Sequence, residues 1–166
     1  MWSVFEKLVD PYPDTPPAAP PRGFFAFLWA CSHGLRRYVL AMTLLTATIG
    51  AFEALLFSML GRIVDWLSQV KPENLWVERK EQLILLCVVL LASPVAVMFQ
   101  TMLKHQTLAG NFPMRLRWNF HRLMLGQSMG FYQDEFAGRI ATKVMQTALA
   151  VRDTILIVAD ILVFVV

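Results

Sequence analysis

Charged residues are scarce in this 166-residue sequence: they make up 16% of it, whereas hydrophobic residues make up 57%. Average soluble proteins contain about 25% charged and about 45–50% apolar residues. The deficit is concentrated in two runs, because residues 38–61 contain one charge, Glu53, and residues 83–103 contain none. This clustering excludes an ordinary soluble domain and indicates a membrane protein.

Both apolar runs are long enough to cross a bilayer. As helices they would span about 36 Å and about 31 Å, and the hydrocarbon core is about 30 Å thick. Backbone polar groups in lipid must be paired within their own segment, so we expect two transmembrane helices. Residues 1–37 lack an apolar core followed by a cleavage site, so we expect the first helix to remain in the mature protein.

Cysteine and histidine are also rare, with two and three residues respectively. Cys31 and Cys87 have no metal-ligand spacing, and neither His105 nor His121 has a Cys or a carboxylate pair beside it. We therefore expect no metal site and no catalytic residues, and we interpret both cysteines as small apolar residues in helices. The net charge of +3 comes from basic residues that flank the apolar runs, which does not favour a nucleic-acid partner.

Residues 1–22 are predicted to form a proline-rich cytoplasmic leader. Its first ten residues are predicted to form a short amphipathic helix, with one side made by Trp2, Phe5, Leu8 and Val9. Six of the nine prolines follow between Pro11 and Pro21, where they exclude regular helix and strand. A plain linker is favoured over a proline-rich recognition segment.

The next segment, residues 23–33, is apolar and aromatic but too short to span a membrane. Arginines flank it, so we predict an interfacial helix. Four Lys and Arg residues precede the first span, four lie between the spans and seven follow the second. Eleven Lys and Arg residues therefore flank the pair of spans, and four lie between the spans. This difference predicts that both ends are cytoplasmic and that residues 68–82 connect an antiparallel hairpin outside.

Beyond Leu103 the helical pattern continues into a polar context. One apolar stripe recurs every four residues at Leu108, Phe112, Leu116 and Phe120, and a second stripe is formed by Ile140, Val144, Ala148 and Val151. These stripes predict a cytoplasmic helical hairpin, with a bend at residues 111–113 and a break bracketed by Gly126 and Gly130. Pro94 frees a carbonyl one turn earlier in the second span, which invites a kink; a hinge and a tolerated transmembrane proline are equally good interpretations. An apolar run from Ile155, interrupted by Asp160, is expected to begin a third span, so residues 23–166 form an incomplete domain.

Residues 115–154 resemble the first intracellular loop of the ABC exporter transmembrane domain. An arginine-flanked helix begins at Arg115, the tip reads Gly130-Phe-Tyr-Gln-Asp-Glu-Phe-Ala-Gly138, and a further helix begins Arg139-Ile-Ala-Thr-Lys. In that family an Arg-rich helix leads to a Phe-Phe or Phe-Tyr pair. A Gly and an (Ile/Leu)-x-(Ser/Thr)-(Arg/Lys) segment follow. The segment at residues 23–33 is similar to the family's elbow helix.

The resemblance implies an all-α membrane protein: an interfacial helix, two transmembrane helices, a long cytoplasmic helical hairpin and the start of a third span. It implies a dimeric exporter of the inner membrane that works by alternating access. ATP and Mg would bind a nucleotide-binding domain, since this sequence has no G-x-x-x-x-G-K-[ST] motif and no cofactor site of its own. The coupling element to that domain would comprise Phe131, Tyr132, Gln133, Asp134, Glu135 and Phe136; an ordinary turn is the alternative.

A candidate substrate pathway is formed by Glu53, Phe57 and Met59. A carboxylate within a membrane costs about 2.5–3.5 kcal/mol, so Glu53 is expected to face a cavity or a partner. Hydration near the outer surface is an equally good interpretation, and core packing is favoured for the other two. Two alternative functions are open: a membrane hairpin adaptor that binds a soluble partner, and half of an ion-coupled transporter that uses Glu53.

Overall fold

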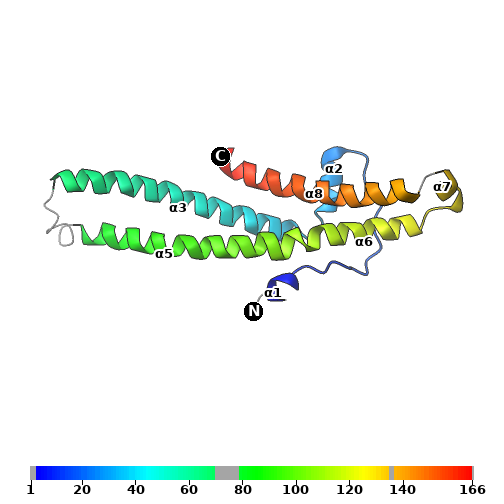
Figure 1. Cartoon of the computed structure of the whole chain (residues 1–166), viewed down its shortest axis with the longest axis horizontal. Helices are drawn as coiled ribbons and strands as arrows, with labels where there is room; N and C mark the ends of the chain where they lie inside the picture. Colours follow the sequence, from blue (N-terminus) through cyan, green and yellow to red (C-terminus); the bar gives the residue numbers. More distant parts are fainter. Residues whose placement is uncertain (1–2, 70–78, 135–136, 166) are drawn as a thin grey trace.

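The computed structural model describes residues 3–69, 79–134 and 137–165, and every regular element within those ranges is a helix. The molecule is elongated (Figure 1). Two long helices lie side by side in one half, α3 (Arg36–Gln69) and α5 (Lys80–Met102). A second helix pair, α6 (Asn111–Leu125) and α8 (Ala137–Val165), forms the other half, which we call the arm.

The two predicted spans are present as helices, and α3 is longer than its apolar run. With 34 residues, α3 is about 51 Å long, which exceeds a hydrocarbon core of about 30 Å. The polar connection predicted at 68–82 is described only at its ends. Helix α3 continues to Gln69, α5 begins at Lys80, and residues 70–78, including Pro72 and Asn74, lie outside the described residues.

Helices 36–66 and 80–125 have the length and composition needed to cross a membrane. Only 6% of the residues in the most apolar stretch of each are buried within the molecule. The core helix of a soluble protein would hide most of these side chains, whereas Phe57 and Leu91 are 74% and 73% exposed. These exposed apolar surfaces fit contact with lipid.

The second span continues into the arm through an irregular segment. A π-helix, η2 (Leu103–Ala109), and Gly110 join α5 to α6. The sequence placed this irregularity at residues 111–113, but Pro113 lies in the first turn of α6, where proline is tolerated. Proline cannot donate to the Ala109 carbonyl, and Arg152 of α8 donates to it instead at 3.3 Å. Helix α5 is uninterrupted at Pro94.

The arm returns through a short helix at its tip, α7 (Met129–Asp134). The predicted break is therefore confined to residues 126–128, because Gly130 lies within α7. From Ala137 the chain forms one helix to Val165, so the predicted cytoplasmic helix and the apolar run from Ile155 are continuous. Within the described residues α8 does not combine the length and apolar composition of a membrane span. A third span therefore stays a prediction.

The N-terminal region differs most from expectation. Of the helix predicted over residues 1–10, the described residues form only α1 (Ser3–Glu6). The Asp10 carboxylate accepts a hydrogen bond from the Tyr12 backbone N–H, a local turn that competes with helix. The predicted interfacial segment is helical as α2 (Phe24–Cys31). A tight turn links α2 to α3, and Gly34 adopts a φ of 82° there.

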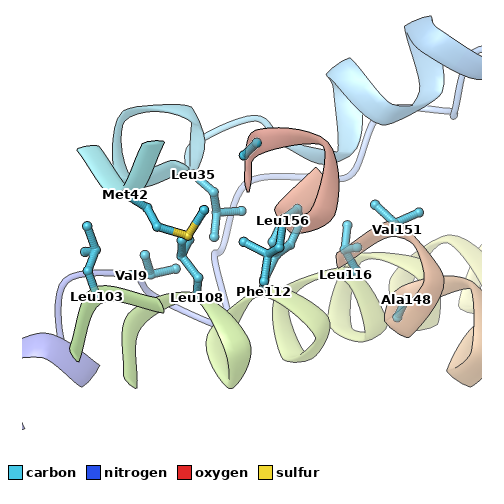
Figure 2. Close-up of a cluster of buried hydrophobic side chains, with 11 residues drawn as sticks. Val9, Leu35, Met42, Leu103, Leu108, Phe112, Leu116, Ala148, Val151 and Leu156 are labelled. Atoms are coloured by element: carbon cyan, nitrogen blue, oxygen red, sulfur yellow. The ribbon is translucent and has the colours of Figure 1, made fainter. Parts of the chain in front are cut away.

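A hydrophobic core forms where the hairpin meets the arm (Figure 2). It combines side chains from the leader, the α2–α3 turn, α3, η2, α6 and α8: Val9, Leu35, Met42, Leu103, Leu108, Phe112, Leu116, Ala148, Val151, Leu156 and Ala159. Both predicted apolar stripes contribute to it. Phe120 continues the first stripe and stacks on Phe27 of α2 at a centroid distance of 6.4 Å. The periodicity of the arm helices is thereby confirmed.

Candidate functional site

The arm tip carries the residues predicted to couple to a partner. Ser128 caps α7, because its hydroxyl and carbonyl oxygens accept the Phe131 N–H at 3.4 and 3.1 Å. The rings of Phe131 and Tyr132 meet edge to face at 5.4 Å. Helix α6 ends at Leu125, and Gly126 follows it with a φ of −84°. The tip is thus a compact transverse helix.

The two tip aromatics have different surroundings. Tyr132 is 36% exposed, and its hydroxyl donates a hydrogen bond to the Met124 carbonyl at the end of α6. Phe131 is half-buried and Gln133 is exposed. Tyr132 therefore fastens α7 to the arm as well as presenting an aromatic surface. The side chain of Asp134 and both residues Glu135 and Phe136 lie outside the described residues.

A cavity of about 610 Å³ opens between α6 and α8 beside the tip. Its lining is mostly apolar and includes Trp118, Met124, Tyr132, Val144 and Met145. Tyr132 lines this cavity from α7, and Tyr12 of the leader lines it as well.

The candidate substrate pathway is divided by the structure. Glu53 and Phe57 are exposed and line one groove between α3 and α5, together with Leu56, Leu60, Ile63, Leu86 and Leu90. Met59 is 3% exposed and is not part of that groove. The preference for core packing therefore agrees with Met59 but not with Phe57. Glu53 lies 16 residues after Arg37, which is about 24 Å along the helix.

An ion pair at the end of the second span escaped sequence reasoning. Lys104 of η2 donates to the Asp160 carboxylate of α8 at 2.7 Å, and both side chains are less than one-third exposed. The sequence pattern indicates Asp160 only as an interruption of the apolar run that begins at Ile155. A carboxylate within an apolar run requires a partner. Applied to Asp160, this rule could have indicated an ion pair.

Metal binding finds no support in the residues that the structure describes, since no group of three His, Cys, Asp or Glu side chains is close enough to hold an ion. Neither Cys31 nor Cys87 belongs to such a group within the described residues. Cys31 is half-buried in α2, and burial raises its pKa from 9.0 to about 11. A thiol with a raised pKa is a poor nucleophile at neutral pH.

A relative of known class matches nearly the whole chain. The chain is 50% identical over 165 residues to an uncharacterised ABC transporter ATP-binding protein of Haemophilus influenzae. This match covers 99% of the chain and 27% of that protein, so the chain spans about a quarter of its relative's length. No family model and no solved structure matches the chain.

Proposed function

We propose that this chain is the N-terminal part of the transmembrane domain of an ABC exporter. The observation that carries the proposal is the architecture of the second span, which continues beyond its apolar run into the arm and turns back through α7. The relative's name supports a general role in ABC transport. The export direction and the alternating-access cycle rest on the family resemblance of residues 115–154.

In this proposal the full protein moves a substrate across the inner membrane as a homo- or heterodimer surrounded by lipid. ATP and Mg belong to a nucleotide-binding domain of the same or a partner chain. The 166 residues contain no phosphate-binding loop, so we assign them no step of ATP hydrolysis. Their part is to line one portion of the pathway and to receive movement at the arm tip.

Helix α7 is the proposed point of contact with the nucleotide-binding domain. Phe131 and Tyr132 supply an apolar anchor, and the sequence adds the polar residues Gln133, Asp134 and Glu135, a combination common at protein interfaces. Phe136 completes the segment. Helix α6 is about 22 Å long, so the tip stands well clear of the end of the second span.

Replacing Phe131 and Tyr132 together by Ala in the full-length protein tests this contact. Loss of a buried anchor costs about 2 kcal/mol or more at an interface hot spot. Basal ATP hydrolysis should persist, while its stimulation by substrate and transport itself are lost. Reconstituted vesicles containing equal amounts of each protein would provide both measurements.

Two further variants locate the effect. Gln127→Ala changes an exposed residue beside the tip and should transport as the wild type does. Tyr132→Phe removes the hydrogen bond to Met124 but keeps the ring, so it should retain most of the coupling. Normal transport by the double Ala variant at wild-type abundance would show that α7 is only a turn.

The proposed topology places the leader and the arm tip in the cytoplasm. Both native cysteines are first replaced by Ala. A single cysteine at Gln69 then reports the end of α3, and a single cysteine at Gln127 reports the arm tip. In intact cells a membrane-impermeant thiol reagent should label the Gln69 site and leave the Gln127 site unmodified. The opposite pattern would reverse the orientation.

Glu53 and Phe57 are our candidates for contact with a substrate, because both line the groove between α3 and α5. The same observation favours a second function, in which Glu53 binds a coupling ion in half of an ion-coupled transporter. Met59 is left out of either site since it is buried elsewhere. Transport that requires ATP hydrolysis and not an ion gradient would separate the two functions.

A further inference from the structure

The described part of the leader lies along the arm instead of extending freely. Its backbone carbonyls accept hydrogen bonds from side chains that project from η2 and α6. Thr107 donates to the Phe5 carbonyl at 3.0 Å, and Asn111 donates to the Glu6 carbonyl at 2.8 Å. These bonds hold α1, which precedes the proline-rich stretch, against η2 and the first turn of α6.

Contacts continue along α6 as the leader proceeds. The Arg115 guanidinium donates to the Asp10 carbonyl at 3.3 Å, and the Trp118 indole N–H donates to the Pro13 carbonyl at 3.2 Å. One nitrogen of Arg122 lies 3.0–3.1 Å from three successive carbonyl oxygens, those of residues 13, 14 and 15. The leader and α6 thus run in the same direction, and Figure 1 shows the leader following α6 before it turns towards α2.

The contact joins side-chain donors of η2 and α6 to backbone carbonyls of residues 5–15. Beyond α1 these residues form turns, bends and irregular backbone, so their carbonyls lie outside a helix or strand ladder and are available to a surface that combines N–H donors with an aromatic ring. Trp118 provides both parts, since its ring also packs edge to face on Tyr12 at 5.5 Å. Arg122 adds a charged donor, which strengthens hydrogen bonds to carbonyl oxygen.

The leader spans the irregular segment that joins α5 to α6. The regular hydrogen-bond ladder changes at η2, and Pro113 removes a further donor immediately after it. The leader is fastened on both sides of this segment, because the Tyr38 hydroxyl of α3 donates to the Leu8 carbonyl at 2.6 Å while Arg122 holds residues 13–15. The path from Leu8 to Thr15 therefore braces the arm against the hairpin.

We propose that the face of α6 formed by Asn111, Arg115, Trp118 and Arg122 is a binding surface for the irregular backbone of leader residues 6–15. The chain's own leader occupies this surface as a releasable strap across η2. Release is feasible because the arm holds the leader chiefly through backbone carbonyls, and Val9 is the only residue buried between positions 5 and 22. With the strap bound, the arm moves with the spans; with the strap released, the arm bends at residues 103–113.

Hydrogen exchange in the full-length protein in lipid nanodiscs tests the strap. Deleting residues 2–15 should speed amide exchange in residues 103–125 at least tenfold. Arg122→Ala combined with Trp118→Phe should have the same direction of effect, and it retains Val9 in the core in case the deletion impairs folding. Arg62→Ala, which removes an exposed arginine near the far end of α3, is the matched control and should leave that exchange unchanged.

Binding in trans gives an independent measurement. A labelled synthetic peptide of residues 1–22 should bind the leaderless protein, slow its exchange again, and bind full-length protein at least tenfold more weakly because the surface is occupied. Arg122→Ala in the leaderless protein should weaken peptide binding at least tenfold. Wild-type exchange in both the deletion and the double variant, or equal peptide binding to leaderless and full-length protein, would overturn the proposal. Neither readout depends on transport, so this inference can stand or fall separately from the coupling role of α7.

Discussion

The hairpin of α3 and α5 and the junction at the base of the arm are stabilised in different ways. In the hairpin most apolar side chains face outwards, and few residues, such as Met59 and Val89, are buried. At the junction the chain forms a true core around Phe112 and Leu108, both 0% exposed. Six separate segments contribute to this core, whereas the hairpin joins only two helices.

This difference indicates where the chain depends on its surroundings. Lipid offers no hydrophobic driving force for pairing helices, so the hairpin must rely on packing, on lipid and on neighbouring helices. The junction excludes water by itself, and it includes Val9 of the leader and Leu156 of α8. We infer that the junction fixes the direction of the arm relative to the spans.

Phe112→Ala tests the comparison most severely, because we expect it to lower the free energy of unfolding more than any other variant. Removing a fully buried phenylalanine destabilises a protein by about 3–5 kcal/mol, because the lost burial and the cavity both contribute. Unfolding of the full-length protein by SDS titration in mixed micelles would measure the change. Leu91→Ala is the control in α5; it removes a side chain that is 73% exposed and should cost less than 1 kcal/mol.

An equal loss of stability in the two variants would contradict the comparison. It would mean that Leu91 is buried against another part of the full-length protein and that the hairpin has a core of its own there. A small effect of Phe112→Ala alone would instead show that the junction contributes little to the fold.

Periodicity predicted the arm correctly because it reports burial directly. Leu108, Phe112 and Leu116 recur on one helical face, and all three are buried. The two spans could be predicted equally well, since a run of more than 20 apolar residues has few alternatives to a membrane helix. Element type and packing face could therefore be predicted from residue spacing alone.

The leader and the π-helix could not be predicted in this way. The leader is held through its backbone carbonyls, which every residue carries, so its sequence contains no pattern that reveals the contact. The Ala109 carbonyl, which Pro113 leaves free, is paired by Arg152, 43 residues further along the chain, and local residue spacing does not reveal such a contact. At the tip, sequence reasoning identified Phe131 and Tyr132 but not the bond from the Tyr132 hydroxyl to Met124.

Gly34→Ala should produce an intermediate effect at the junction. Gly34 has a φ of 82°, and a Cβ there would lie 2.8 Å from the Arg115 guanidinium. The left-handed conformation alone costs an L-residue about 1–2 kcal/mol, and displacement of Arg115 would weaken its hydrogen bond to Asp10. The same SDS titration would measure the total change.

Gly50→Ala provides the matched control within the hairpin. Gly50 lies in α3, and an added Cβ meets nothing within 4 Å. Because alanine favours helix over glycine by about 1 kcal/mol, this variant should be neutral or slightly more stable. If Gly34→Ala matched it, the turn between α2 and α3 would have to be more adaptable than its geometry indicates.

The smallest expected effect on stability concerns Cys31, which packs against the junction core. Burial raises the pKa of this thiol from 9.0 to about 11, so the fold favours the protonated form. Any stabilisation from this preference is fully present below pH 9 and is lost only as the pH rises through about 11. Stability between pH 6 and 8 should therefore not depend on Cys31. Its alkylation rate should be reduced, since the thiolate is the reactive species.

Iodoacetamide modification of the folded protein would measure that difference after Cys87 is replaced by Ala. A shift from 9.0 to about 11 lowers the thiolate fraction at pH 8 about a hundredfold. The control is a cysteine at the exposed position Gln127 in a protein that lacks both native thiols. The control rate should level off above about pH 9, whereas the Cys31 rate should keep rising by about tenfold per pH unit until about pH 11. If Cys31 reacted as fast as the control and levelled off at the same pH, α2 would have to separate readily from the junction, and the core would be less closed than its buried side chains indicate.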